Sequence, residues 1–504
     1  MFGSDFGVSV TVSQRPSARP GLPVPLPAGV TRRRARLSEV IDVAGMDEVG
    51  LAEELGTIAD ARSQLAAYEA VVVARFAALR PADTDRGPEE PGHRVAGWCA
   101  EEPPAGVSEF FADELAMVRG TSPQAAGTLL DRSLVLVHQL PDTCAALADS
   151  VIDEPRAAAI AKALGGQGEP FGGRVDPGVV AQVEAQALAW AVARETPRRL
   201  QERVAAALIA LDEAAADRRR KKHERNTDVV VRSLPDGMAE LTATLPAPVA
   251  AACRETVDGY ARMAKADGDE RPIGQLRAEI MADLVLRPWD TSREPVTAHL
   301  HVLAPLPAAG DTASGEAATV DGAPITAGQL RELLEQLDAL CPGGLQAPIG
   351  GSLGIDLTDP ATGELRATVT RPELERLVRA GAVLDRPPPI DRYEPTPAQQ
   401  RFVKARDRTC RHPGCRRPAR WTDADHVVAH ADGGETDCAN LCSLCRRHHR
   451  LKTHAPGWRF VMDDDGTLHV TTPSGVTRTT RPPGLRLPLA LTTAADDPDD
   501  PPPF

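Results

Sequence analysis

The sequence predicts an α+β multidomain protein, with a mainly helical N-terminal region that contains a few strands and a small metal-stapled module after it. Apolar residues recur at three- and four-residue spacing through most of 37–266, as amphipathic helices require. Short stretches after Asn226 change to a period of two, which indicates strands. Cysteines and histidines crowd between Cys410 and His454, where metal ligands can converge. A chain of 504 residues is long enough for two or three domains.

We expect five segments along the chain. A leader over 1–36, rich in Pro, Arg, Gly and Ser without periodicity, is expected to be disordered. A mainly helical domain occupies 37–390 and ends in a Pro-rich boundary. Residues 391–460, called the C-terminal module below, hold the metal ligands; a hairpin and extension over 461–491 follow. The acidic, Pro-rich tail over 492–504 is also expected to be disordered.

Several helices are predicted with their ends. Leu51–Arg80 fits one long amphipathic helix, and Ser108 is a plausible N-cap for the next. Ser122–Leu140 opens with Ser, Pro and Gln in the order of a cap and first turn, and Pro141 stops it. Further helices are expected over 153–164, 175–194, 197–225, 247–266, 273–286, 326–340 and 371–380.

Strands are predicted in three places. Asp228–Pro246 alternates with a period of two around Pro-Asp-Gly, which is a hairpin signal. Val296–Leu306 is a further strand, and the residues after Pro456 form a hairpin with Asp464–Gly466 in its turn.

Composition narrows the cellular setting. The chain has no apolar run of 18 residues and no basic start followed by an apolar core, so we expect neither a membrane span nor a secretory signal. Five of nine cysteines crowd between Cys410 and Cys445, which favours metal binding in a reducing cytoplasm over a disulfide framework.

The net charge of −14 is unevenly distributed along the chain. Residues 401–460 contain 13 Lys and Arg and six Asp and Glu, a net charge of +7, so the remaining residues carry −21. A basic module within an acidic chain suggests contact with a polyanion.

Two pairs of soft ligands predict a structural zinc site. Cys410 and Cys415 have four residues between them, and Cys445 and His448 have two. Paired thiolates and imidazoles at such spacing suit a closed tetrahedral Zn²⁺ site. Cys442 remains a possible substitute ligand and His454 a possible further one, while Cys438 and Cys442 are otherwise expected to be buried apolar residues. His412 and His430 are expected at the surface.

A second group of residues lies between and beside those pairs. Asp425 and His426 are neighbours, Asn440 follows, and His449 comes directly after His448; Gly433-Gly434 lies between them. In order and residue type this arrangement resembles the HNH endonuclease motif, in the version whose flanks carry a zinc site.

That resemblance implies a fold and a chemistry. The fold would be a β-hairpin followed by a helix around a metal, with the first strand near 420–425, the hairpin through 427–436 and the helix from 438 or 439 to 450. His426 would be the general base, while Asp425 and His449 would hold a catalytic Mg²⁺ or Mn²⁺ beside the scissile phosphate. Asn440 would orient the loop that carries the base; as a residue at a helix start, it would also suit an N-cap.

Basic side chains surround the motif and can contact DNA phosphates without reading sequence. The candidates are Arg416, Arg417, Arg446, Arg447, Arg450 and Lys452.

The helical region carries a resemblance of its own. The stretches DELAMVRGTSPQAAGTLLDRSLVLVHQLP, DGMAELTATLP, IGQLRAEIMADLVL and AGQLRELLEQ resemble the bacterial 13E12 repeat family, catalogued as domain of unknown function 222. That family joins such a region to a C-terminal HNH module, which implies the architecture but no role for the helices. We therefore expect a cytoplasmic, metal-dependent DNA endonuclease with no membrane partner. The alternative is a catalytically inactive, zinc-stapled DNA-binding or interaction protein.

Overall fold

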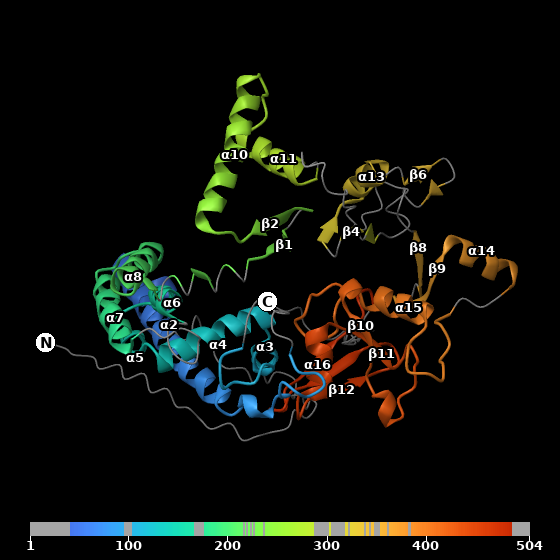
Figure 1. The fold of residues 1–504 in the computed structure, drawn as a ribbon, viewed down its shortest axis with the longest axis horizontal. Helices are drawn as coiled ribbons and strands as arrows, with labels where there is room; N and C mark the ends of the chain where they lie inside the picture. The colour runs from blue at the N-terminus through green and yellow to red at the C-terminus, as the bar shows by residue number, and fades with distance from the viewer. Residues whose placement is uncertain are drawn as a thin grey trace, which may run out of the picture. The chain divides into compact units, whose positions relative to one another are not determined.

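The computed structural model describes residues 41–94, 103–165, 176–286, 302–303, 318–359, 362–381 and 385–485, with short breaks inside 215–226, 235–236, 321–322, 337–338, 342–343 and 347–352 (Figure 1). The predicted leader over 1–36 and tail over 492–504 lie outside the described residues, as does most of the strand expected at Val296–Leu306. The chain is a mixture of helices and antiparallel strands, as predicted.

The chain divides into a unit that ends at Arg62 and a unit that begins at Ser63. In the first, a 3₁₀ turn η1 (Val43–Gly45) precedes the start of helix α2 (Glu48–Ala77). The predicted helix over Leu51–Arg80 is therefore confirmed to within three residues at each end. The buried residues of α2 all lie in the second unit.

Helices dominate the second unit up to residue 211. Their bounds are α3 Phe111–Arg119, α4 Pro123–His138, α5 Pro141–Ala148, α6 Glu154–Leu164, α7 Pro177–Val192 and α8 Pro197–Leu211, with a 3₁₀ turn η2 at Ala82–Thr84. Alanine, leucine and valine from α4 to α8 form one core, in which α6 and α7 both pack on α8 (Figure 1). A second core joins Phe111 and Leu115 of α3 to Leu130 of α4 and the end of α2.

Some of these helix ends agree with the ends predicted from capping residues and prolines, and others do not. Ser122 caps α4 as predicted, since its hydroxyl accepts the Ala125 N–H at 3.2 Å and Pro123 takes the first helical position. Ser108 does not cap α3: its hydroxyl donates to Asp85 at 2.6 Å, and the helix begins three residues later. Pro141 follows the end of α4 and takes the first position of α5, a helix that was not predicted.

The middle of the second unit alternates short strands and helices. Strands β1 (Val229–Ser233) and β2 (Ala239–Ala243) form the predicted antiparallel hairpin. The other elements are α10 Ala247–Ala266, α11 Ile273–Leu286, β3 Val302–Leu303, β4 Ala318–Val320, β5 Ala323–Ile325, α13 Ala327–Gln336, β6 Leu340–Cys341, β7 Gly344–Leu345, β8 Gly354–Thr358, β9 Leu365–Thr370 and α14 Arg371–Arg379.

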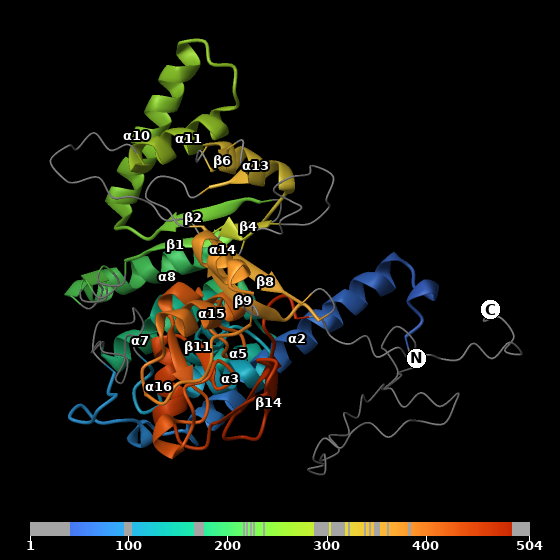
Figure 2. The same cartoon turned by 90° about the vertical axis from the view of Figure 1, so that its right-hand side faces the viewer.

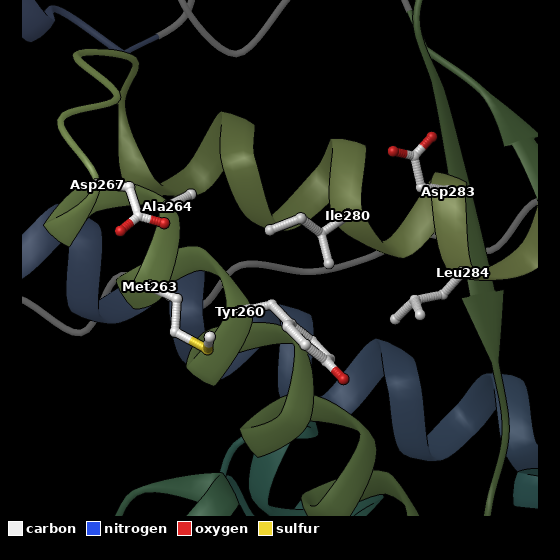
Figure 3. Close-up of a pocket in the computed structure, with 7 residues that line it drawn as sticks. All are labelled: Tyr260, Met263, Ala264, Asp267, Ile280, Asp283 and Leu284. Atoms are coloured by element: carbon white, nitrogen blue, oxygen red, sulfur yellow. The ribbon is translucent and has the colours of Figure 1, made fainter. Parts of the chain in front are cut away.

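Helices α10 and α11 pack together and border an open hollow (Figure 3). It is lined by Tyr260, Met263, Ala264, Asp267, Ile280, Asp283 and Leu284. The lining contains no Cys or His and no paired acid and base at one point, so the hollow offers no evident catalytic group.

The C-terminal module contains a hairpin followed by a helix. Helix α15 (Pro397–Asp407) leads into the antiparallel pair β10 (Asp423–His426) and β11 (Leu441–Leu444), and α16 (Arg446–His454) follows. Two 3₁₀ turns, η3 at Ala419–Trp421 and η4 at His430–Asp432, lie within it. Both α15 and α16 contact the β10–β11 pair (Figure 2).

The predicted start of the last helix was wrong. The helix was expected from Cys438 or Ala439, but the chain forms β11 first, and α16 begins at Arg446. The reason is tertiary. All four residues of β11 are buried, and the ionic side chains of Arg406 and Asp407 at the end of α15 bond to backbone groups along this stretch.

Asp407 is the centre of that buried network. Its carboxylate accepts the Ser443 N–H at 2.7 Å and binds the guanidinium groups of Arg406 at 2.8 Å and Arg411 at 3.0 Å. Arg406 in turn donates to the carbonyls of Cys438 and Leu441, each at 2.7 Å. These buried charges are therefore paired and hydrogen-bonded, as burial of charge requires.

A meander follows the module. Strands β12 (Arg459–Met462), β13 (Leu468–Thr471) and β14 (Thr477–Thr480) pair in order and antiparallel. The predicted hairpin around Asp464–Gly466 is confirmed, with Gly466 at a φ of 80°, and a third strand extends it.

Within the described ranges, no helix is both long enough and apolar enough to cross a bilayer.

We predict that Asp407→Ala destabilises the C-terminal module by about 3–5 kcal/mol, because it leaves two buried arginines without their carboxylate. Urea unfolding followed by a probe in the module measures this. The exposed Asp432→Ala serves as the control and should change stability by less than about 0.5 kcal/mol. Equal effects of the two substitutions would contradict a central role for Asp407.

Candidate metal centre

The four predicted zinc ligands converge on one point. The ligand atoms of Cys410, Cys415, Cys445 and His448 all lie within 4.8 Å of one another. His448 Nδ1 is 3.3 Å from the sulfur of Cys410 and 3.3 Å from that of Cys445. The loop after α15 supplies the first two cysteines, and the first turn of α16 supplies the other pair.

These distances suit tetrahedral zinc. Bonds of ~2.3 Å to sulfur and ~2.0 Å to nitrogen, at a tetrahedral angle, put sulfur and nitrogen about 3.5 Å apart. Cys445 is the N-cap of α16, where the helix dipole favours a thiolate. Contacts with Cys410 and Cys415 hold the pKa of the Cys445 thiol far below its usual range, while burial raises that of Cys410. A divalent cation would relieve this crowding of thiols.

Two residues outside the predicted set enclose His448. Asp113 of α3 is fully buried, and its Oδ1 lies 3.2 Å from His448 Nε2. His412 stacks on the His448 ring, with centroids 3.9 Å apart and planes at 5°. His412 was expected at the surface, but it is 1% exposed, and burial lowers its pKa to about 3. The neutral ring fits because its Nδ1–H can donate to the Pro413 carbonyl at 3.0 Å.

A second group forms on the next residue of α16. His449 Nε2 is 3.3 Å from Asp425 Oδ1, and its Nδ1 is 3.1 Å from Asp423 Oδ2. Asp423 and Asp425 alternate along β10, so both side chains leave the same face of the strand toward α16. Hydrogen bonding to Asp423 raises the pKa of His449 and lowers that of Asp423.

Both oxygens of the buried Asp425 carboxylate face basic groups. Its Oδ2 is buried without a hydrogen-bond partner, and the Lys452 ammonium faces it at 3.2 Å. An O–N separation of 3.3 Å between Asp425 and His449 also suits two neighbouring ligands of one ion. In the part of the chain that the structure describes, three or more metal ligands gather only at the Cys3His group, so this second place offers a pair of protein ligands.

His426 lies on the other side of β10 from Asp425, as neighbours on a strand do. Its Nε2 is 2.8 Å from the Thr436 hydroxyl, which itself donates to the Arg392 carbonyl at 2.5 Å. Since that hydroxyl has a single proton, His426 Nε2 must donate, and the lone pair is on Nδ1. Burial lowers the pKa of His426, which keeps the ring neutral, and Tyr393 stacks on it with centroids 5.4 Å apart.

Asn440 binds the loop between the two strands at both ends. Its Oδ1 accepts the Val428 N–H at 2.9 Å, and its Nδ2 donates to the carbonyls of Val428 at 3.0 Å and Glu435 at 2.9 Å. Gly434 packs so closely on Val428 that a Cβ would lie 2.0 Å from its carbonyl oxygen. The helix-cap interpretation of Asn440 was wrong, because β11 rather than α16 follows it.

Several of the predicted DNA contacts already have partners within the chain. Arg447 Nε donates to Asp113 at 2.9 Å, Arg450 pairs with Glu109 at 2.5 Å, and Lys452 pairs with Asp425. Arg446 is exposed and lies 3.3 Å from Asp423. Arg416 and Arg417 are exposed in the loop that holds Cys415, a candidate metal ligand.

The residues left open as extra ligands stay outside the metal group. Cys438 and Cys442 are buried as expected, and burial raises the pKa of Cys438 to about 11. His454 packs against Gly92, where an added Cβ would lie 2.0 Å from its Nε2. Neither cysteine nor His454 belongs to the Cys3His group.

The model of a protein family described only as a domain of unknown function, DUF222, matches residues 54–339, which is more than half of the chain. The chain belongs to the DUF222 family. The family resemblance predicted from the helical stretches is thereby confirmed. The match ends before the Cys3His group.

Relatives of the DUF222 chain occur in Mycobacterium tuberculosis. It is 43% identical over 142 residues to uncharacterized protein Rv3776, which is 27% of each chain. It is also 43% identical to uncharacterized protein Rv2100 over 138 residues, 26% of this chain and 25% of that one. The matched stretches thus span about a quarter of the length of these relatives. No solved structure matches the chain.

We predict that Cys415→Ser removes the bound zinc and unfolds the C-terminal module, because so small a module has little core without its metal. Metal analysis of the purified chain, together with protease sensitivity of the module, measures both effects. Cys442→Ala is the control, since Cys442 is buried but outside the group. If Cys442→Ala loses zinc while Cys415→Ser keeps it, the assigned ligand set is wrong.

Proposed function

We propose that the C-terminal module is a zinc-stapled HNH endonuclease that hydrolyses DNA phosphodiester bonds with one divalent metal. The observation that carries this proposal is the juxtaposition on β10. The buried Asp425 places Oδ1 beside His449 and Oδ2 beside the Lys452 ammonium, and His426, with its lone pair on Nδ1, follows Asp425 in the strand. The order of hairpin and helix supports the same reading.

In this proposal Asp425 and His449 hold Mg²⁺ or Mn²⁺. When bound, the ion would act as a Lewis acid that stabilises the charge on the leaving 3′ oxygen. Asp423 fixes the His449 ring through its Nδ1, so that Nε2 faces the metal place. A pair of protein ligands is enough for Mg²⁺, which commonly keeps several waters and binds substrate phosphate.

His426 serves as the general base. Its Nδ1 accepts a proton from the attacking water, while the Thr436 hydroxyl holds Nε2–H and so fixes the tautomer. In an in-line displacement, the attacking and leaving oxygens lie on opposite sides of phosphorus. Asp425 and His426 leave opposite faces of β10, so they share one phosphate only if the chain bends at His426, the last residue of the strand. Asn440 keeps the connecting loop closed through its three backbone bonds.

A second candidate function is binding without cleavage. Lys452 already compensates Asp425 at 3.2 Å, and Arg447 and Arg450 are engaged by carboxylates of the helical region. A module whose charges are satisfied internally could bind DNA or another partner through Arg416 and Arg417 and hold zinc only for its fold. We place either activity in the cytoplasm, where the reducing environment keeps the clustered thiols free.

We predict that His426→Ala lowers the rate of DNA cleavage by ~10²–10⁴-fold, because the general base is lost. Zinc content and DNA affinity should stay unchanged, since His426 contacts neither the zinc ligands nor the exposed arginines. Single-turnover nicking of supercoiled DNA in Mg²⁺ or Mn²⁺ is the measurement.

His430→Ala is the matched control: His430 touches both Tyr393 and the His426 ring, but it has no assigned role. Equal rates for His426→Ala and the wild type would refute the assignment of the base. If the wild type cuts no DNA in any divalent metal, binding without cleavage becomes the function.

We predict that the pair Arg416→Ala and Arg417→Ala weakens DNA binding and makes its salt dependence shallower by about two units of slope, one for each lost phosphate contact. Binding titrations across a salt series measure this. The pair Arg198→Ala and Arg199→Ala in α8 removes the same charge from another exposed place and should leave the slope as it is. An unchanged slope in the first pair would rule out these phosphate contacts.

A further inference from the structure

We propose that α3 of the DUF222 region is part of the metal centre. In this inference, Asp113 holds the zinc ligand His448 in place, and zinc binding is thermodynamically coupled to the docking of α3 on α16. The inference rests on the proposed structural zinc and not on DNA cleavage.

The orientation of the His448 ring leads to this assignment. Nδ1 faces the sulfurs of Cys410 and Cys445 at 3.3 Å each, so Nε2 faces away from the cluster. A histidine that binds zinc through Nδ1 carries its proton on Nε2 and needs an acceptor there. Asp113 Oδ1 occupies that place at 3.2 Å, from a residue 335 positions earlier in the chain.

Burial makes the contact more than an incidental ion pair. Asp113 is 0% exposed and His448 is 2% exposed, so the carboxylate has left water entirely. Its second oxygen binds Arg447 Nε at 2.9 Å. Burial alone would raise the pKa of Asp113, but Arg447 and His448 outweigh it and hold that pKa well below its usual range. A buried carboxylate is tolerated only with such partners.

The faces of α3 explain why a charge stands in this helix. Phe111 and Leu115, four positions apart, pack into the helical core with α2 and α4. Asp113 and Met117, also four apart, share another face, and Met117 packs with Cys410 and Cys445. The helix therefore presents one apolar face to the DUF222 core and another face to the metal cluster.

Contacts on both flanks of α3 fix its position against the C-terminal part of the chain. Glu109 pairs with Arg450 of α16 at 2.5 Å. Glu114 accepts the Ser474 N–H at 3.0 Å, and Arg478 of β14 donates to the Met117 carbonyl at 3.0 Å. Because α16, the β13–β14 turn and β14 all contact α3 or the residues just before it, these contacts fix the position of Asp113 relative to His448.

Coupling follows from this geometry. A carboxylate behind a zinc-bound histidine orients the ring and raises its basicity, and loss of such a partner commonly costs ~10–100-fold in metal affinity. Linkage makes the effect reciprocal: if docking of α3 strengthens zinc binding, zinc must strengthen the docking of α3 to the same extent.

The first test measures the zinc affinity of the full chain by competition with a chromophoric chelator, with circular dichroism to verify the fold. We expect Asp113→Ala to weaken zinc binding by ~10–100-fold, and Asp113→Asn to weaken it less, because the amide oxygen can still accept from Nε2–H. Glu184→Ala is the matched control: it removes another buried carboxylate of the helical region, one that accepts hydrogen bonds from Thr143 and contacts no zinc ligand, and zinc affinity should stay unchanged.

The second test uses the reciprocal effect. Removing zinc with a chelator should speed hydrogen exchange of α3 amides in the wild type, while the amides of α6 in the helical core keep their protection. Zinc affinities that are equal in Asp113→Ala and Glu184→Ala would overturn the inference. A wild-type chain that binds no zinc would overturn it together with the proposed zinc site. Weaker zinc binding by Asp113→Ala supports it even if the chain cuts no DNA.

Discussion

The C-terminal module depends on how three thiols and an imidazole are accommodated within 4.8 Å of one another. Cys410, Cys445 and His448 are almost fully buried, so water cannot disperse their charge. The cysteines share the surrounding core with larger apolar side chains, among them Met117, Leu444 and Leu468. A cation at this point would neutralise the thiolates and link the loop after α15 to the start of α16.

Two adjacent histidines in one turn of α16 contribute side chains to two different clusters. His448 and His449 leave α16 about 100° apart, so one faces the thiols and the other faces β10. Each ring has a carboxylate beside one nitrogen. Asp113 lies beside Nε2 of His448, and Asp423 lies beside Nδ1 of His449. The two carboxylates have different origins, since Asp423 belongs to the neighbouring strand and Asp113 to the helical region. The proposed zinc site therefore depends on a residue of the helical region, whereas the residues of the second site all belong to the module.

The sequence predicted the parts that local patterns determine. Long amphipathic helices, the cap at Ser122 and the spacing of the zinc ligands all act over a few residues, and the structure agrees with them. The start of α16 was mispredicted because Asp407, far outside the local window, pairs with backbone N–H at Ser443 and favours a strand there. The contribution of Asp113 could not be foreseen, since no spacing rule links residues 335 positions apart. The only local signal was a charged residue within an otherwise apolar helix face.

The place of Asp113 has a consequence for how this protein is divided. Sequence similarity would cut the chain after residue 339, where the DUF222 match ends. A fragment that begins beyond that cut would keep every sulfur and nitrogen ligand and still lose the acceptor behind His448, along with the seat for Arg447. Exchange of helical regions between relatives would meet the same difficulty, because the incoming α3 must carry an acid at this position. If Asp113 has the proposed role, the part of the chain that must stay together is therefore longer than the part that the family model matches.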